Sequence, residues 1–389
     1  MTCKTLAVVG ASYLQVPLVV AAKEMGLRVI AFAWQDGAVC APLCDRFYPI
    51  SIVEKDRILE ICRQEKIDGI TSIASDVAVP TIAHVAAALG LPGNSCESAL
   101  LSTDKHMMRK KLADAGLPCP RFLAAKSPHE AVPQTAGQGL RYPLIVKPTD
   151  RSGSLGVTKV SSDLELVNGV AAALEASFSK TVVIEEFIDQ AREVSVEGIS
   201  WNGHYTPLAV TDKVTTGSPH FVELEQHQPA KMTNDLRHKL SCMAAEAAST
   251  LKIRQGATHT EFMIAPDGRI YVTEVGARMG GDFIGSHLVK LSTGYDFVKA
   301  VIECALGSFA APKKPLEPMK CSGVFFACGE RPDVEDFIKA RNYGDAVVAA
   351  ELNSANRHQN LSCSADRIGY VLYQDNARPT SVKSLTRRL

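Results

Sequence analysis

Two glutamates in the stretch THTEFMIAPDGRIYVTEVGARMGGDFI, residues 258–284, have the type and spacing of a metal-binding pair. Asp267-Gly268 favours a two-residue type I′ hairpin turn, because both central positions of that turn need a positive φ. With such a turn, Pro266 faces Arg269, Met263 faces Val272, and Glu261 faces Glu274. Facing residues of antiparallel strands have Cβ atoms about 5 Å apart.

Two carboxylates at that separation repel each other unless a cation, a shared proton or open solvent intervenes. Mg²⁺ prefers oxygen ligands and typically takes one or two carboxylates together with substrate phosphates. The hairpin therefore predicts a Mg²⁺–phosphate site (with Mn²⁺ as a possible substitute) with Glu261 and Glu274 as ligands. The alternative is a pair of exposed glutamates on a solvated face.

Arg278 follows the second strand of the hairpin and stands beside Gly280-Gly281, where backbone can approach a ligand closely. The planar fork of an arginine suits phosphate and carboxylate groups. We expect Arg278, Gly280 and Gly281 to contact the substrate, although a lone arginine is more often part of a surface ion pair.

A second candidate site is the stretch YPLIVKPTDRSGSLGV, which ends a strand in Lys147 and continues through a loop rich in small residues. Backbone N–H groups of such a loop can surround anionic oxygens, and the lysine adds a point charge. GxxxxGK[ST] is absent, so the loop is not a P-loop. A plain flexible turn is the alternative. The loop residues proposed to contact phosphate are Ser152, Gly153, Ser154 and Gly156.

Taken in order, these segments resemble the ATP-grasp superfamily of carboxylate–amine ligases, and the L-amino acid ligases in particular. The resemblance rests on DKHMMRK with Lys105, the Lys147 loop, VVIEEFIDQAREVSVEG, the glutamate hairpin and GARMGGD, and it covers nearly the whole chain. Each motif alone is loose, but their common order is specific.

The resemblance implies a role for each matching residue. Lys105 and Lys147 would contact ATP phosphates, and the loop from Ser152 to Gly156 would close over the γ-phosphate. The base and ribose would be held by the segment with Glu185, Glu186, Ile188 and Glu193. Glu261 and Glu274 would be the Mg²⁺ ligands, and Arg278, with Lys147, would act on the transferred phosphoryl group. In HFVELEQHQPA, Glu223 and His227 are candidate contacts to an amino-acid substrate, with ordinary loop residues as the alternative.

One position departs from the family pattern: Gly276 stands where a further Asn ligand is usual, which puts the second metal in doubt. The expected activity is formation of an acyl phosphate from a carboxylate and ATP, followed by attack of an amine, with release of ADP and phosphate. Two rival functions stay open. One is an ATP-grasp enzyme of the biotin carboxylase, carbamoyl phosphate or purine-synthesis type, and the other is a non-catalytic ATP-binding module.

The elements that must position these residues divide the chain into three predicted parts. Residues 1–102 alternate strand and helix patterns, which predicts a parallel α/β domain. The turn after its first strand, at Gly10, lacks GxGxxG spacing and favours a simple strand-to-helix turn over a dinucleotide site. Residues 103–312 form the predicted ATP-grasp module of α/β and α+β structure, with a lid subdomain at about 120–187 and a catalytic subdomain at about 188–312. Residues 313–389 are predicted to form a small C-terminal α+β domain.

The amino-acid composition argues against several classes of function. Lys plus Arg and Asp plus Glu are 42 each, which argues against general binding to nucleic acid or to an anionic membrane. Eleven cysteines without a CxxC pair favour free thiols in a reducing cytoplasm, and Cys40 and Cys44 are expected to pack rather than to bind zinc. No apolar run is long enough to span a bilayer. We expect a cytoplasmic enzyme that acts on small molecules, with a homodimer as a possible assembly.

Overall fold

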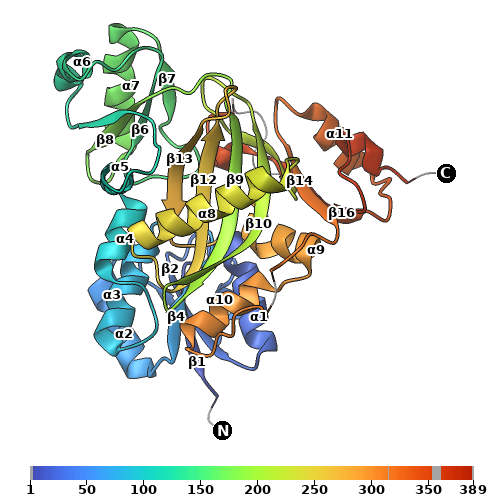
Figure 1. Cartoon of the computed structure of the whole chain (residues 1–389). Coiled ribbons are helices and arrows are strands. Elements are labelled where there is room, and N and C mark those ends of the chain that lie inside the picture. Colours follow the sequence, from blue (N-terminus) through green and yellow to red (C-terminus); the bar gives the residue numbers. More distant parts are fainter. Residues whose placement is uncertain (1–2, 314, 353–360, 388–389) are drawn as a thin grey trace.

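The computed structural model describes residues 3–313, 315–352 and 361–387, and its strands form three sheets (Figure 1). The N-terminal sheet has four parallel strands in the order β3-β2-β1-β4. Its strands and covering helices are β1 (Thr5–Val9), α1 (Val16–Glu24), β2 (Arg28–Ala33), β3 (Arg46–Pro49), α2 (Lys55–Glu65), β4 (Gly69–Thr71) and α3 (Val79–Leu89).

Strand β1 is buried along its whole length, because helices cover both faces of this sheet. Leu6 and Val8 pack into one core, whereas Ala7 and Val9 pack into another. The first of these cores also contains Phe297 and Ile302, which belong to a helix near residue 300. The N-terminal domain is therefore packed against the rest of the molecule through a shared apolar core.

Two helices lead from this domain to the second sheet: α4 (Cys96–Thr103) and α5 (Lys105–Asp114). Asp104 caps α5, because its side chain accepts a hydrogen bond from the Met107 N–H at 2.8 Å. The second sheet has the order β5-β8-β6-β7 and lies within the residues predicted to form the lid subdomain, so we call this part the lid. Its elements are β5 (Phe122–Ala125), α6 (Pro128–Gly137), β6 (Leu144–Pro148), β7 (Thr158–Val160), α7 (Asp163–Ala176) and β8 (Val182–Glu186).

Alternation along the lid strands separates a core face from a polar face. Leu144 and Val146 of β6 pack under the helices with Val182 and Ile184 of β8. The intervening side chains, which include Lys147 and Glu185, therefore point away from the helices. The lid thus presents a charged face toward the remainder of the chain.

The third sheet has eight strands, in the order β13-β12-β9-β10-β11-β14-β16-β15. The strands are β9 (Arg192–Trp201), β10 (His204–Thr215), β11 (Glu223–Gln228), β12 (Gly256–Ile264), β13 (Ile270–Gly276), β14 (Cys321–Ala327), β15 (Val347–Leu352) and β16 (Gly369–Asp375), and the helices of this part are α8 (Asn234–Thr250), α9 (Val289–Thr293), α10 (Phe297–Ala305) and α11 (Pro332–Ala340).

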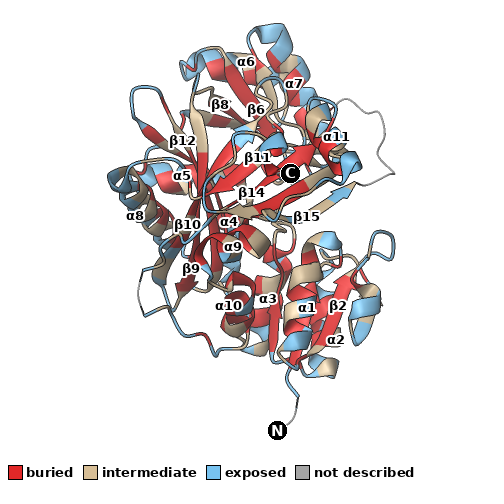
Figure 2. Ribbon diagram, turned by 90° about the vertical axis from the view of Figure 1, so that its right-hand side faces the viewer, coloured by how far each residue is buried: buried red, intermediate tan, exposed pale blue. Residues whose placement is uncertain are grey.

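Helix α8 covers one face of this sheet, where Val194, Val196 and Phe262 contact Leu240 and Ala244 (Figure 1). Polar residues fill the other face near the lid. Alternation along β9 therefore places Glu193, Ser195 and Glu197 on the face opposite the valines. The buried positions in Figure 2 lie mainly along the strands and at the inner faces of the helices.

Strands β14, β15 and β16 extend the same eight-stranded sheet rather than forming a sheet of their own. The predicted boundary at residue 313 therefore divides a continuous sheet, and it stays a prediction. Among the described residues, no helix is long and apolar enough to cross a membrane.

Candidate active site

The turn of the glutamate hairpin differs from the predicted one. The Gly268 N–H donates to the Ala265 carbonyl at 2.9 Å and the Ala265 N–H donates to the Arg269 carbonyl at 2.8 Å. The loop therefore has three residues, Pro266 to Gly268, with Gly268 at a φ of 83°. Such loops combine a turn that tolerates proline with a final left-handed residue, a position that suits glycine. The predicted two-residue turn is wrong.

The extra loop residue shifts the pairing near the turn, so that Met263 faces Tyr271 and not Val272. A β-bulge between Glu261 and Phe262 then absorbs one residue of β13, at Thr273, and shifts the pairing back. Glu261 faces Glu274, as predicted. The glutamate pair is thus obtained through two local irregularities that offset each other.

Cationic side chains surround the two glutamates and offset their repulsion. Lys105 Nζ lies 3.1 Å from Glu274 Oε2, and Lys213 Nζ lies 2.7 Å from Glu261 Oε1. His259 Nε2 lies 3.0 Å from the same Glu261 oxygen. Burial alone would raise the pKa of Glu261, but the charges of Lys213 and His259 hold that pKa well below its usual range.

Lys213 is the centre of a cluster that we call the sheet cluster, made of Lys213, Glu193, Glu223 and Glu261. The Lys213 ammonium forms an ion pair with Glu193, and its Nζ lies 3.5 Å from Glu223 Oε1 and 2.7 Å from Glu261 Oε1. Its side chain is only 3% exposed. Burial would lower the pKa of Lys213, but the three carboxylates raise it well above the usual value. Lys213 is therefore charged and outnumbered by anions.

A second cluster, the lid cluster, consists of Lys147, Glu185 and Arg109. Lys147 Nζ donates to Glu185 Oε1 at 2.6 Å, and Arg109 Nη2 donates to the other Glu185 oxygen at 2.8 Å. Burial lowers the pKa of Lys147, with a further contribution from the charge of Arg109. Burial would raise the pKa of Glu185, but its two cationic neighbours lower it.

The loop between β6 and β7 lies close to the residues that the sequence analysis assigned to phosphate. Lys105 Nζ donates to the Arg151 carbonyl at 2.6 Å while it also pairs with Glu274. Gly153, Ser154 and Gly156 have φ values of 65°, 60° and 75°. A Cβ at Gly156 would stand 3.0–3.2 Å from Pro148 and Ala176 atoms, so glycine is needed there. Ser152 is exposed at the start of the loop.

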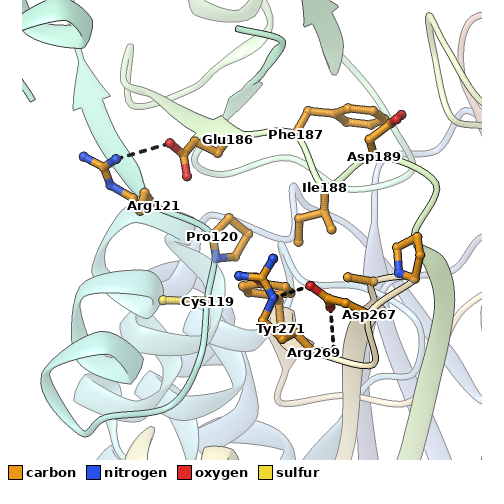
Figure 3. Close-up of a pocket in the computed structure, with 12 residues that line it drawn as sticks. Cys119, Pro120, Arg121, Glu186, Phe187, Ile188, Asp189, Asp267, Arg269 and Tyr271 are labelled. Carbon is orange, nitrogen blue, oxygen red and sulfur yellow. Dashed lines mark hydrogen bonds and ion pairs between the residues drawn. The ribbon is translucent and has the colours of Figure 1, made fainter. Parts of the chain in front are cut away.

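The hinge between lid and sheet lines a cavity of about 550 Å³ (Figure 3). Glu186, Phe187, Ile188 and Asp189 form one wall, and the hairpin tip with Tyr271 forms another. Glu186 points away from the lid cluster, because adjacent residues of a strand face opposite sides, and it pairs with Arg121 at 3.4 Å. Ile188 lies between β8 and β9 and lines this cavity.

The two substrate candidates on β11 are separated by a β-bulge. Glu223 faces Thr215 and Gln226 faces Lys213, whereas His227 faces Asp212 on the opposite side of the sheet. His227 is 1% exposed and lies between the Tyr373 hydroxyl, at 2.7 Å, and Glu225, at 2.8 Å. The structure therefore brings Glu223 to the sheet cluster but not His227. Gln226, which sequence reasoning missed, is buried on the cluster side, and its Oε1 has no hydrogen-bond partner among the described residues.

The turn after β13 is held by the buried carboxylate of Glu197. The Gly280 N–H donates to Glu197 Oε2 at 3.0 Å, and a Cβ at Gly280 would stand 2.9 Å from that oxygen. Glu197 also contacts His259 Nδ1 at 2.5 Å. Burial would lower the pKa of His259, but the charge of Glu197 raises it to about 9. Gly281 follows in the same turn, and a Cβ there would lie 3.8 Å from Ala74.

Arg278 forms an ion pair across the domain boundary. Its Nε and Nη2 atoms donate to the two carboxylate oxygens of Asp76, each at 2.8 Å. Arg278 Nη2 also lies 3.9 Å from Glu274 Oε1. The predicted residues Arg278, Glu274 and Lys105 are thus within 4 Å of one another in a chain of contacts, with Asp76 as a member that the sequence did not reveal. Glu261 faces Glu274 in the hairpin, but its side chain contacts Lys213 and His259.

Within the described residues, no group of three or more His, Cys, Asp or Glu side chains is arranged to hold a metal ion alone. A pair of facing carboxylates nevertheless fits Mg²⁺, since that ion commonly takes its remaining ligands from phosphates and water. The donor set of Glu261 and Glu274 is compatible with a nucleotide-bound Mg²⁺.

Sequence and structure comparisons agree with this architecture. Residues 104–310, more than half of the chain, match the family described as "Carbamoyl-phosphate synthase L chain, ATP binding domain". The alanine–anticapsin ligase of Bacillus subtilis is 25% identical over 289 residues, which are 68% of this chain and 60% of that protein. The chain thus spans less than two thirds of that relative's length.

Two solved structures share the fold over almost the full chain. The L-amino acid ligase of Bacillus licheniformis superposes with a TM-score of 0.78 at 25% identity, covering 97% of this chain and 94% of that one. The N5-carboxyaminoimidazole synthetase of Staphylococcus aureus, complexed with ADP, gives a TM-score of 0.76 at 17% identity, with 98% and 94% covered. The chain therefore has the ATP-grasp fold and belongs to the carbamoyl-phosphate synthase L chain ATP-binding domain family.

Proposed function

We propose that this protein is an ATP-dependent ligase that activates a carboxylate as an acyl phosphate and joins it to an amine, releasing ADP and phosphate. The observation that carries the proposal is the convergence of Glu261 and Glu274 with Lys105 and Arg278. Facing carboxylates suit a cation, and the neighbouring cationic groups suit phosphates. Together they match the needs of phosphoryl transfer.

The nucleotide is proposed to lie between the lid and the eight-stranded sheet. Lys147 and Lys105 supply positive charge for its phosphates, with the N–H groups of the loop from Ser152 to Gly156. The base is proposed to lie near Glu185 and Glu186, where β8 ends and the chain continues through Ile188 to the eight-stranded sheet. Glu193, on the adjoining strand, is the proposed contact to the ribose.

Glu261 and Glu274 would hold Mg²⁺, which supplies neutralisation of charge on the transferring phosphoryl group. Arg278 is placed to donate hydrogen bonds to that group, because its guanidinium lies beside Glu274. Loop closure would exclude water, which would otherwise hydrolyse an acyl phosphate. No protein nucleophile is required by this route, so the cysteines have no part in it.

Amino acids are the proposed substrates. The similarity to an alanine–anticapsin ligase and to an L-amino acid ligase supports this choice. Glu223 and the unpartnered Gln226 Oε1 are both acceptors on the cluster side of β11, and an ammonium group is a donor that would suit them. We further propose a cytoplasmic location, which the eleven free thiols support.

The test is a screen of amino-acid pairs for ADP formation with Mg-ATP, with hydroxylamine present to trap an activated acyl group. We expect ADP release that needs a carboxylate substrate, and a hydroxamate derived from that same acid. ADP release that depends on bicarbonate instead would favour a carboxylase-type enzyme. Tight ATP binding with no phosphate release across a broad panel would contradict the proposal and support a non-catalytic module.

A further inference from the structure

Asp76 is the one carboxylate that the N-terminal domain contributes to the short contacts around Glu274 and Arg278. It lies in the connection between β4 and α3, and therefore at the carboxyl end of a parallel strand, where α/β sheets commonly bind ligands. Its partner, Arg278, follows β13, 202 residues further along the chain. The side chains of Asp76 and Arg278 are only 16% and 9% exposed.

The pair fixes the orientation of the guanidinium. Asp76 occupies the edge formed by Nε and Nη2, with both contacts at 2.8 Å. Nη1 donates to the Met279 carbonyl at 3.2 Å, and Nη2 lies 3.9 Å from Glu274 Oε1. A bidentate carboxylate holds the plane of an arginine as well as its position. Nη2, which Asp76 holds, is therefore also the guanidinium atom that approaches Glu274.

Gly276 leaves space for this pair. A Cβ at position 276 would stand 3.1 Å from Arg278 Cζ and 3.2 Å from Asp76 Oδ1. Gly276 is not among the glycines with a positive φ, so its backbone does not require glycine. The requirement is space, and a larger side chain at 276 would press on the Asp76–Arg278 contact.

We infer that Asp76 is a positioning residue, which aims Arg278 at the phosphoryl group held beside Glu274. This inference rests on the proposed function, because it concerns the role of Arg278 in that reaction. The N-terminal domain then takes part in phosphoryl transfer, although its own residues need not touch the nucleotide. The Asp76–Arg278 pair needs glycine at position 276, because a larger side chain there would press on it.

The competing explanation is that Asp76 and Arg278 merely tie two domains together. The chain offers a matched control for that role in Asn94, which accepts hydrogen bonds from the Arg254 and Gln255 N–H groups at 2.8 and 2.9 Å and donates to the Gln255 carbonyl at 2.8 Å. Asn94 also joins the N-terminal domain to the neighbourhood of β12, but it makes none of these bonds to Arg278. Asn94→Ala therefore removes an interdomain tie and leaves the arginine in place.

The experiment compares Asp76→Ala with Asn94→Ala in the full chain. In Asp76→Ala we expect kcat to fall about 100-fold with the KM for ATP raised about 10-fold at most, because a misdirected arginine loses contacts that are strongest in the transition state. Formate, a carboxylate small enough for the vacated space, should restore part of kcat in a saturable manner. Asn94→Ala should keep kcat near that of the wild type and show no response to formate.

A binding measurement makes the test independent of the substrates. By calorimetry, Asp76→Ala should lose about 10-fold in affinity for Mg-AMP-PNP while its affinity for Mg-ADP stays the same, because Arg278 would no longer face the terminal phosphate. If wild-type protein released no ADP in the screen, the proposed function would fail. The ratio of the affinities for Mg-AMP-PNP and Mg-ADP would still test the orientation of Arg278. Equal effects of Asp76→Ala and Asn94→Ala on kcat and on this ratio would overturn the inference. Should Asp76→Ala not fold, Asp76→Asn, which keeps the size of the side chain, carries the same readouts.

Discussion

The lid cluster and the sheet cluster are both buried ion-pair networks, but they carry opposite excess charge. In the lid cluster two cations, Lys147 and Arg109, share the single carboxylate of Glu185. In the sheet cluster one cation, Lys213, is surrounded by three carboxylates, those of Glu193, Glu223 and Glu261. Burying unbalanced charge is costly unless a partner of the opposite sign is bound.

The difference in excess charge indicates which kind of ligand would neutralise each cluster. An excess of positive charge on the lid suits the phosphates of a nucleotide, and an excess of negative charge on the sheet suits a cation such as Mg²⁺. Mg-ATP carries both kinds of charge in one ligand. In the proposed function the two clusters would bind opposite parts of the same molecule, and this would favour closure of the lid on it.

The largest effect is expected on the metal side. Glu274→Ala removes one of the two facing carboxylates and leaves Lys105 without its 3.1 Å partner. We expect ADP formation to fall by about 10³-fold or more, since charge on the transferring group would no longer be neutralised. The rate of ADP release under saturating Mg-ATP measures it.

Glu97→Ala, which removes an exposed carboxylate paired with Lys252, is the control for that loss. Turnover of Glu274→Ala close to that of Glu97→Ala would refute the metal assignment.

Replacing the lysine should lower the free energy of unfolding more in the sheet cluster than in the lid cluster. Lys213→Met leaves three partly buried carboxylates without their shared cation, and among the described residues only Glu261 keeps an ion-pair partner, His259 at 3.0 Å. We expect this substitution to lower the free energy of unfolding by about 3–5 kcal/mol. Lys147→Met should cost less, because Glu185 keeps Arg109 at 2.8 Å. Urea unfolding without divalent metal measures both.

The same variants also test whether the excess charge of the sheet cluster is negative. Added Mg²⁺ should raise the melting temperature of Lys213→Met more than that of the wild type, since the ion replaces the missing cation. No such difference, or equal costs for the two substitutions, would contradict the comparison.

Alkaline titration should affect the clusters differently. The pKa of Lys147 is lowered, so between that pKa and about 10.5 the unfolded chain binds more protons, and the stability contribution of Lys147 rises with pH. The pKa of Lys213 is raised, so its contribution is constant up to about 10.5 and is lost only above that pH. Differences in unfolding free energy between wild type and each Met variant, taken from pH 8 to about 10.5, should slope for Lys147 and stay flat for Lys213. A slope for Lys213 in that range would contradict the assignment.

The smallest effect is expected at the turn that brings the glutamates of the sheet side together. Gly268 has a φ of 83°, and we expect Gly268→Ala to lower the free energy of unfolding by about 1 kcal/mol. A Cβ there meets no atom within 4 Å, so ADP formation should be unchanged. Thermal unfolding and turnover are the measurements, and a large loss of turnover would show that the bulge at Thr273 does not fix the glutamate pairing independently of the turn.

Much of the site could be predicted because it depends on local patterns. Alternation in β9 separates Glu193 and Glu197 from the valines of the core. The strand assignments around Lys147 and Glu185 hold for the same reason. The hairpin prediction gave the right pairing of Glu261 with Glu274 but the wrong turn, because a bulge cannot be recognised from the alternation of residue types.

Position along a strand was less informative where the strand is irregular. Simple alternation places Glu223 and His227 on one face, but the bulge in β11 turns His227 away and brings Gln226 to the cluster. Lys213 was missed because one charged residue in a strand is ordinary, and only its three partners, drawn from β9, β11 and β12, distinguish it.

The sequence by itself determined the elements and the order of the motifs, since these follow from periodicity, turn residues and glycines within short windows. Only the tertiary structure decided which charges meet. Arg109 contacts Glu185 across 76 residues and Asp76 contacts Arg278 across 202. Such contacts depend on how separate sheets pack. An unpaired buried charge is costly, so each buried charge needs a partner, and no local sequence pattern specifies that partner.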